Sequence, residues 1–340
     1  MDRRTLLKSS GALAALTFMP VRAFADSGRI EVSLDTGPNH VRNLSMEALA
    51  KEIGAASSEQ LEMKIFHGAS KFKGADVPIA VAQGALDMGV PGTWQMGKAV
   101  PDYNITALPM MYGIGYEDQY AVWDGPAGQA LNKNLEDKLK IKVIGRWINL
   151  GFAQMFFTDK RVTSHADLAG MKMRAPGGAA NLARFKAFDA TAVSIPFSDL
   201  AQALQRQTVD GVLTTHESVR SSKLWDSGLK YCYEDNQTLF QYVPVMSARA
   251  WDRLGEEGQQ LLMSLWEDKV DGVRALAVER QQSARVEGAE NGIETIEASA
   301  QDLAAMRKKL MADQVALVKE LRIDPTIVEQ AQATLASRQG

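Results

Sequence analysis

A single arginine, Arg174, stands where a strand-like segment runs into a helix-like one. Residues 171–175 have β character and residues 179–188 have a helical pattern, with Pro176-Gly177-Gly178 between them. Proline favours extended geometry at the residue before it, and the glycines let a helix begin close to the arginine. A guanidinium beside the free N–H groups of a helix N-terminus could hold a small anion, most simply a carboxylate. The same spacing also fits a surface arginine in a salt bridge.

Motifs for enzyme chemistry are incomplete in this sequence. Residues 70–73 fit Ser-x-x-Lys, but no Ser-Asp-Asn or Lys-Thr-Gly element follows. Residues 92–98 match most of a phosphate-binding loop, yet Ala99 replaces the hydroxyl that would hold Mg²⁺. Glu217 and Arg220, three residues apart, fit a helix-face ion pair. The four histidines lack ligand spacing, and one cysteine, Cys232, cannot form an internal disulfide or a cysteine-rich metal site. We therefore predict no catalysis, no metal and no cofactor.

The elements that must position Arg174 alternate between strands and helices. Strands are expected at 29–34 and 61–66, and helices at 40–56 and 77–86, which predicts an α/β sheet. Ligands collect at strand-to-helix junctions of such sheets. Two junctions therefore offer candidate contacts, Asn39 in the first and Trp94 in the second. Core packing is an equally good account of Trp94.

The second half of the chain carries one unusually long helical pattern, from 256 to about 290. At ~1.5 Å per residue it would be roughly 50 Å long, which exceeds the width of one lobe. The other expected elements are helices at 118–139, 300–321 and 325–337 and β segments at 141–148, 153–158, 230–242 and 293–296. A chain of 340 residues is expected to divide into two lobes.

Composition and the N-terminus indicate an exported globular protein. Apolar residues make up 46% and charged residues 23%, and the net charge of −3 gives no reason to expect nucleic acid. Residues 1–25 fit a signal peptide, with the pair Arg3-Arg4, a mild apolar run too short to span a bilayer, and a cleavage site at Ala23-Phe24-Ala25. The arginine pair favours twin-arginine export, with general secretion as the alternative. We expect a periplasmic mature chain that is not embedded in a membrane.

The region around Arg174 resembles the signature of the TRAP-transporter (DctP-type) solute-binding proteins, a family that includes C4-dicarboxylate and sialic-acid binders. The family pattern is a leucine-glycine turn, a lysine-x-arginine strand, a small-residue helix, a proline-phenylalanine step and a final "ALQ…VDG". In this chain the matching segments are 168–170, 172–174, 177–181, 196–199, 203–205 and 209–211. A weaker likeness extends from about residue 30 to the C-terminal helices.

The resemblance implies a two-lobe periplasmic-binding-protein fold, type II-like, with a hinge and a long lobe-spanning helix. The first lobe would contain 26–151 and 240–279, and the second 152–239 and 280–335. Such a protein closes on a small organic anion and delivers it to the membrane subunits of a TRAP permease.

The resemblance also assigns site residues. Arg174 matches the arginine that clamps the carboxylate of the ligand, and Phe197 matches a pocket phenylalanine that packs on its carbon skeleton. Thr214 falls where sialic-acid binders place an asparagine, so its hydroxyl is a candidate hydrogen-bond donor. Gln154 stands where many carboxylate-sugar binders have a second arginine, which puts a second ionic clamp in doubt. Further candidates for polar and aromatic contacts are Trp94, Asn39 and Trp147.

The expected ligand is a small organic acid bound through its carboxylate. One arginine among apolar and hydroxyl groups suits a monocarboxylate, hydroxy acid, dicarboxylate or sugar acid alike. A sulfonate also offers two oxygens to the guanidinium and remains an alternative. An unrecognised periplasmic enzyme is the other alternative.

Overall fold

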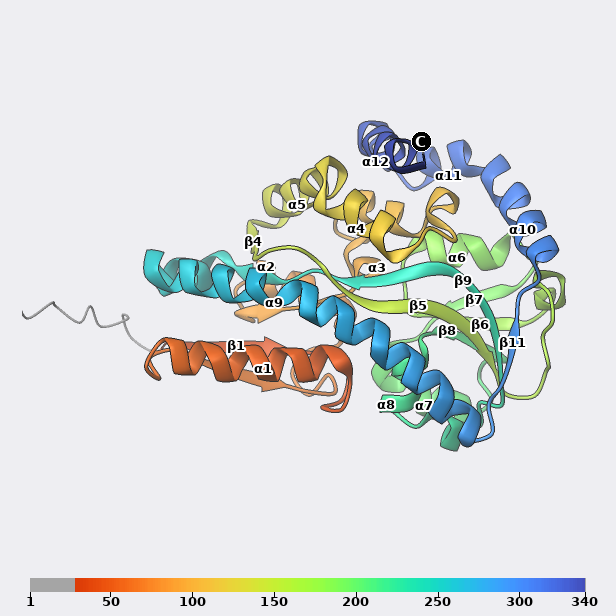
Figure 1. Cartoon of the computed structure of the whole chain (residues 1–340), viewed down its shortest axis with the longest axis horizontal. Coiled ribbons are helices and arrows are strands. Elements are labelled where there is room, and N and C mark those ends of the chain that lie inside the picture. The colour runs from red at the N-terminus through yellow and green to blue at the C-terminus, as the bar shows by residue number, and fades with distance from the viewer. Residues whose placement is uncertain (1–27, 340) are drawn as a thin grey trace, which may run out of the picture.

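The computed structural model describes residues 28–339. The predicted signal peptide, 1–25, lies outside these residues. The described chain forms two mixed α/β lobes that lie side by side along the long axis of the molecule (Figure 1). Among the helices of this part of the chain, none has the length and apolar character that a membrane crossing requires.

The first lobe is built on a five-stranded sheet with the order β2-β1-β3-β10-β4. Strand β1 pairs in parallel with β2 and β3, whereas β10 pairs antiparallel with β3 and β4. The strands are β1 (Arg29–Ser33), β2 (Glu62–Phe66), β3 (Met88–Gly89), β4 (Ile141–Val143) and β10 (Val245–Ser247). The helices are α1 (Val41–Ala56), α2 (Val77–Ala82), α3 (Thr93–Met96), α4 (Tyr116–Asp124) and α5 (Pro126–Leu139). Short 3₁₀ turns are η1 (Gly74–Asp76), η2 (Pro101–Ala107) and η3 (Pro109–Met111).

Helices α4 and α5 replace the single helix expected at 118–139. Gly125 is extended and Pro126 occupies the first position of α5. Proline lacks an N–H and fits only the first turn of a helix, so the chain ends one helix and begins another at this point.

The second lobe is built on a six-stranded sheet with the order β11-β9-β5-β8-β6-β7. Its strands are β5 (Ile148–Phe157), β6 (Lys172–Ala175), β7 (Thr191–Ser194), β8 (Gly211–Thr214), β9 (Tyr231–Tyr242) and β11 (Glu294–Glu297). Strand β6 lies between β7 and β8 and is parallel to both. The helices are α6 (Ala179–Lys186), α7 (Leu200–Gln205) and α8 (His216–Ser221), with 3₁₀ turns η4 (His165–Leu168), η5 (Phe197–Asp199) and η6 (Leu224–Ser227).

The lobes are joined where β5 and β9 run side by side as an antiparallel pair. Their register runs from Ile148↔Tyr242 to Phe157↔Tyr231 and shifts at two irregularities, one of them beside Gly151. The backbone of Gly151 has φ +122°, and a Cβ there would lie 2.4 Å from the side chain of Gln281. Glycine satisfies both demands, because it has no Cβ and accepts positive φ. The chain thus crosses between lobes as one bulged strand, whereas we expected an interruption at 149–152.

Helix α9 (Ala248–Glu290) is the third connection between the lobes. Its 43 residues at ~1.5 Å each span roughly 65 Å. It contacts α1 in the first lobe and α8 and β5 in the second (Figure 1). The long lobe-spanning helix is therefore confirmed, although it begins eight residues before the expected start and bends at Gly255, where φ is +64°.

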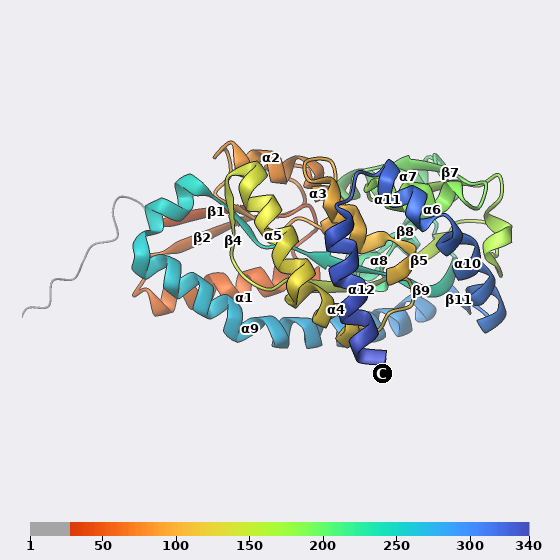
Figure 2. The ribbon, with the colours of Figure 1, turned by 90° about the horizontal axis from the view of Figure 1, so that it is seen from above.

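The C-terminal segment returns to the first lobe. Helix α10 (Ala300–Ala312) and α11 (Gln314–Glu320) lead to α12 (Pro325–Gln339), which contacts α4 and α5 (Figure 2). Buried apolar side chains of α12, Ile327 and Ala331 among them, share a core cluster with Leu131 of α5. This position differs from the expected one, in which 280–335 belonged wholly to the second lobe, because the apolar face of α12 packs on first-lobe helices.

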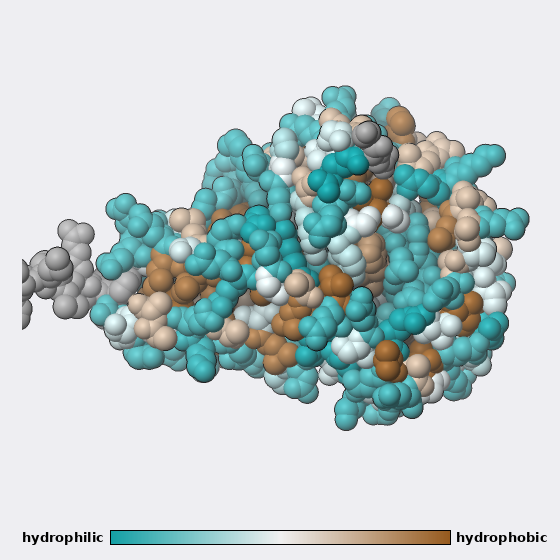
Figure 3. All heavy atoms as spheres, viewed as in Figure 1, coloured by the Kyte–Doolittle hydropathy of each residue, from teal (hydrophilic) through white to brown (hydrophobic). Residues whose placement is uncertain are grey.

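The surface seen from the side of α9 is mainly hydrophilic. In this view apolar residues form separate small groups between polar ones (Figure 3). The apolar side chains gather instead in the interior, where the largest clusters contain Phe157 and Met173 in one case and Tyr103 and Trp147 in the other. Burial of such side chains is the main force that holds each lobe together.

Candidate ligand-binding site

A cavity lies between the lobes and takes its walls from both. It encloses about 560 Å³ of empty space, including its mouth. The first lobe contributes the turn after β1, the start of η1 and helix α3, and the second contributes the ends of β6, β7 and β8. The lining residues are Asp35, Thr36, Gly74, Ala75, Trp94, Gln95, Leu150, Arg174, Pro176, Ser194, Pro196, Phe197, Thr214, Ser218, Phe240 and Tyr242.

Arg174 is the buried cation of this cavity. It sits on β6 with 1% of its surface exposed. Its Nε donates to the carbonyl of Ile195 at 2.9 Å, and its Nη1 donates to the carbonyl of Leu213 at 3.0 Å. No carboxylate of residues 28–339 lies within salt-bridge distance of it. Burial lowers the pKa of Arg174 to about 9, and nearby Asp35 offsets only part of that shift. The guanidinium is thus held in place by neutral carbonyls, and its charge needs an outside partner.

The surface salt bridge considered for Arg174 is therefore not what the structure shows, but neither is the expected helix terminus. Helix α6 begins after Gly178, whose φ is +82°, and the N–H of Ala180 donates to Asn104 at 3.3 Å. Residues of α6 do not line the cavity, because the Gly177-Gly178 turn carries the helix towards Asn104 and the backbone of Trp94. Of the two groups expected to hold an anion, the guanidinium lines the cavity and the N-terminus of α6 does not.

Aromatic side chains form the apolar wall. The Trp94 ring lies 4.3 Å from the ring of Phe240 and 5.6 Å from that of Tyr242, measured between centroids. Phe197 lines the cavity from η5 in the second lobe. Trp94 thus packs on neighbouring rings and also faces the cavity. Core packing and a position at the candidate site, the two alternatives for this residue, are therefore compatible. Such a wall suits the carbon skeleton of a small ligand.

The polar wall contains one buried carboxylate, that of Asp35. Its Oδ1 accepts from Arg42, and its Oδ2 accepts from Nε2 of Gln95 at 3.0 Å. Arg42 is itself buried, donates to the carbonyl of Val90 at 3.0 Å, and lies over the ring of Tyr242. Burial alone would raise the pKa of Asp35, but the Arg42 guanidinium holds that pKa below its usual value. Asp35 is therefore ionised at neutral pH.

Three predicted site residues lie outside this cavity. Gln154 is engaged with the backbone of β9, because its Oε1 accepts from the N–H groups of Asp235 and Asn236 at 3.0 and 3.1 Å. Trp147 is 1% exposed in the first-lobe core, where its indole N–H donates to Asn132 at 2.9 Å. Asn39 is exposed, and its backbone carbonyl accepts from Arg280 at 2.9 Å.

The sequence prediction also missed polar residues that the structure places in the cavity. Asp35 and Gln95 each lie within four residues of a predicted candidate, Asn39 or Trp94. A usable signal existed for Asp35, since it is the first charged side chain after strand β1 and begins a turn cluster. Ser218 and Tyr242 carry no comparable pattern in the sequence.

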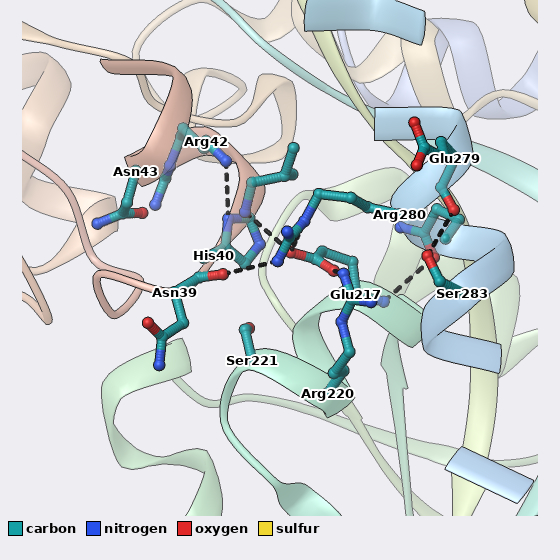
Figure 4. A network of polar contacts seen from close by, with 12 residues as sticks. Asn39, His40, Arg42, Asn43, Glu217, Arg220, Ser221, Glu279, Arg280 and Ser283 are labelled. Carbon is teal, nitrogen blue, oxygen red and sulfur yellow. Dashed lines mark hydrogen bonds and ion pairs between the residues drawn. The ribbon is translucent and has the colours of Figure 1, made fainter. Parts of the chain in front are cut away.

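A second buried charge, Glu217, links the lobes beside the cavity (Figure 4). This fully buried side chain comes from α8, and its Oε1 accepts from the N–H of Val41 at the start of α1, at 2.9 Å. The same oxygen accepts from Nε of Arg280 in α9 at 3.0 Å, and Oε2 accepts from Arg220. The expected Glu217–Arg220 pair is thus present as part of a larger network. We call Glu217, Arg220, Arg280 and the N-terminus of α1 the Glu217 network.

His40 lies between this network and the cavity. Its Nδ1 accepts from the N–H of Arg42 at 3.2 Å, and its Nε2 lies 3.4 Å from Oγ of Ser218 in α8. Burial, together with Arg42, Arg280 and Arg220, lowers the pKa of His40 well below its usual value. The ring is therefore neutral and carries its hydrogen on Nε2, towards Ser218.

One exposed ion pair joins the lobes next to Gly74 and Phe197 of the cavity lining, a position that we call the mouth. Nζ of Lys73, at the start of η1, lies 2.8 Å from Oδ2 of Asp199 in η5. Both side chains are about half exposed, at 51% and 42%. The lobes therefore meet through a buried network behind the cavity and an exposed pair in front of it.

Comparisons with known proteins agree on one family. Residues 33–318 match the family described as bacterial extracellular solute-binding protein, family 7. The chain is 26% identical over 294 residues to the 2,3-diketo-L-gulonate-binding periplasmic protein YiaO of Escherichia coli (strain K12), covering 85% of this chain and 88% of that one. It is 24% identical over 285 residues to the C4-dicarboxylate-binding periplasmic protein DctP of Rhodobacter capsulatus, covering 84% of each.

Solved structures show the same fold. A TRAP periplasmic solute-binding protein from Ralstonia eutropha H16, with bound (S)-2-acetolactate, superimposes with a TM-score of 0.85. The match covers 92% of this chain and 100% of that one at 20% sequence identity. This likeness confirms the two-lobe architecture.

Proposed function

Because the chain belongs to the bacterial extracellular solute-binding proteins of family 7, we propose that it captures a small organic acid in the periplasm and delivers it to a TRAP permease. The observation that carries the proposal is Arg174, a buried guanidinium in an interlobe cavity with no acidic partner among residues 28–339. A carboxylate can accept two parallel hydrogen bonds from such a group. The ligand would supply the missing negative charge.

The relatives support a carboxylate as the recognised group. The names of the two curated relatives state that they bind 2,3-diketo-L-gulonate and C4-dicarboxylates, and the Ralstonia structure holds acetolactate. Each of these compounds carries at least one carboxylate. A carboxylate is therefore favoured here over a sulfonate.

Four of the predicted residues would act together in the cavity. Arg174 would bind the carboxylate, Thr214 would offer a hydroxyl from β8, and Trp94 and Phe197 would cover the carbon skeleton from opposite lobes. The lobes would open and close about the β5–β9 crossing, with α12 moving with the first lobe because it packs on α4 and α5. Members of the family are solute-binding proteins, and we infer that this chain releases its ligand unchanged.

A thermal-shift screen of purified mature protein against organic acids and sulfonates tests the proposal. A ligand that binds only the folded state stabilises it by RT ln(1 + [L]/Kd), about 4 kcal/mol at a thousandfold excess over Kd. The same ligand should reduce the radius of gyration in solution scattering, because the lobes close on it. Absence of a shift with every acid and sulfonate would contradict the proposal. Chemical conversion of a stabilising ligand during incubation would instead support an enzyme.

A further inference from the structure

The cavity lining carries one positive and one negative side chain. Only two of its lining side chains are ionised at neutral pH, Arg174 from the second lobe and Asp35 from the first. The phenol of Tyr242 is neutral, since burial raises its pKa. A ligand held by Arg174 therefore lies in a space whose other fixed charge is a carboxylate.

The Asp35 carboxylate has capacity for a further hydrogen bond. An ionised carboxylate can accept about four, and residues 28–339 supply two through side chains, from Arg42 to Oδ1 and from Gln95 to Oδ2. The backbone of Gly74 packs directly against the Asp35 and Gln95 side chains, because a Cβ there would lie 2.0 Å from both Asp35 Oδ2 and Gln95 Nε2. The carboxylate is thus held in a fixed position at the cavity wall, ready to accept from a ligand.

Charge balance in the buried site permits one ligand carboxylate and no more. Arg42 and Asp35 neutralise each other, so Arg174 leaves one positive charge for the ligand. Arg42 cannot serve a second carboxylate, because it does not line the cavity and its Nη groups donate to Val90, Asp35 and Thr36. The cation at the mouth, Lys73, is paired with Asp199. A second buried carboxylate would therefore lack a partner and would face that of Asp35.

We propose that Asp35 makes the site selective for singly charged acids that carry a hydroxyl group away from the carboxylate, and that it excludes dicarboxylates. This selectivity rests on the proposed function and narrows its ligand class. Arg174 binds the single carboxylate, and Asp35 accepts a hydrogen bond from the distal donor. Hydroxyl groups of Thr36, Ser194 and Ser218 serve the remaining oxygens of the ligand.

Titration calorimetry with matched acids tests the selectivity. One series is butanoate, 4-hydroxybutanoate and succinate, which share a four-carbon chain, and the other is gluconate and glucarate, which share six carbons. In the first series the hydroxy acid should bind roughly tenfold or more tightly than butanoate, because butanoate offers no donor to the free acceptor position of the Asp35 carboxylate. In both series the dicarboxylate should bind roughly thirtyfold or more weakly than the hydroxy monoacid. A dicarboxylate that binds as tightly as its hydroxy partner would overturn the proposal.

Asp35→Asn tests whether Asp35 is the cause. Asparagine keeps the size and an oxygen acceptor but removes the charge, so the preference for the monoacid should shrink by roughly tenfold. Asp76→Asn is the matched control, since Asp76 is an exposed acid two residues beyond Gly74, and it should leave the preference unchanged. An unchanged preference in folded Asp35→Asn would overturn the assignment. If Asp35→Asn does not fold, the affinities of the wild-type protein for the two series test the selectivity alone. If none of the five acids binds and the wider screen also finds no ligand, the proposed function itself would be overturned.

Discussion

Two buried charged residues at the junction of the lobes, Arg174 and Glu217, differ in whether the protein supplies an oppositely charged partner. Arg174 has two neutral carbonyls as partners and no acid within salt-bridge distance in the described chain. Glu217, equally buried and only a few residues beyond β8, is surrounded by Arg220, Arg280 and the N–H of Val41. The charge of Arg174 is thus available to a ligand, whereas the charge of Glu217 is neutralised by arginines of the protein itself.

The difference indicates separate tasks for two regions that lie close together. An unpaired buried charge costs stability, and a protein that retains one gains a group that binds the opposite charge strongly. A paired charge that joins three elements instead fixes their relative positions. We therefore expect substitutions at Arg174 to act on ligand affinity, and substitutions in the Glu217 network to act on the stability of the fold with its lobes in contact.

The largest expected effect is the loss of ligand binding on removing Arg174. Arg174→Ala should weaken binding of the best acid by on the order of 2–5 kcal/mol, which is roughly thirtyfold to several thousandfold. Arg174→Lys keeps the charge but loses the planar fork, so it should restore only part of the affinity. Titration calorimetry measures both. Equal binding by the three proteins would contradict a role of Arg174 in affinity. A fall in the free energy of unfolding of Arg174→Ala as large as its loss of binding free energy would contradict the separation of the two tasks.

The next effect is a loss of stability on neutralising Glu217. Glu217→Gln leaves Arg280 and Arg220 near a neutral group inside the protein, and we expect the free energy of unfolding to fall by about 3 kcal/mol. Urea denaturation measures the change. Glu287→Gln is the control, because Glu287 is a distant, half-exposed partner of the same Arg220, at 3.9 Å. Equal losses in the two variants would show that burial of Glu217 does not matter.

A smaller effect should appear with pH through His40. With the lobes in contact, the pKa of this ring is held well below 6.5, and we expect separation of the lobes to expose the ring and restore its pKa. The open form then binds more protons, so affinity is fully present above about pH 6.5 and falls below it, by at most about tenfold per pH unit. The charged groups that face the ring are Arg42, Arg220 and Arg280.

His40→Asn isolates this contribution, because asparagine can cap α1 and does not titrate. Affinity measured between pH 5.5 and 7.5 should depend less on pH in the variant than in the wild type. An identical pH dependence in both proteins would remove His40 from the closing contact.

The smallest effect should come from the exposed pair at the mouth. Lys73→Met breaks the ion pair with Asp199 and should weaken binding by less than about 1 kcal/mol, because water screens half-exposed charges. Calorimetry at low and high salt should show the two proteins converging as salt rises. A loss as large as that in Glu217→Gln would mean that the front of the cavity, rather than the back, holds the lobes together.

Much of the fold followed from local patterns in the sequence. Strand β1 and helix α1 begin and end within a residue of the prediction, since apolar spacing and flanking turn residues define them. The predicted two-lobe α/β architecture is confirmed by the solved relatives. The errors occur where distant contacts decide. The continuous β5 depends on pairing with β9, and the position of α12 depends on helices nearly two hundred residues earlier.

The cavity was predictable where the family pattern reaches it and, for Trp94, from a strand-to-helix junction. Arg174, Phe197 and Thr214 belong to the signature stretch or follow it at a fixed distance, and all three line the cavity. Gln154 and Trp147 do not, because each found partners elsewhere, in the β9 backbone and in the first-lobe core. Asp35 was not predicted because its proposed role depends on Arg174, which lines the same cavity from the other lobe. The sequence pattern around Asp35 does not show this neighbour.

The position of Trp94 has an optical consequence. Its indole packs at a tilt against Phe240 and faces the cavity, whereas Trp123 and Trp147 are stacked on each other in the first-lobe core, away from it. Displacement of solvent from one face of Trp94 changes the polarity around an excited indole, and tryptophan emission responds to that polarity. We expect ligand capture to shift the intrinsic fluorescence of the unlabelled protein, so the rates of opening and closing become measurable by stopped flow.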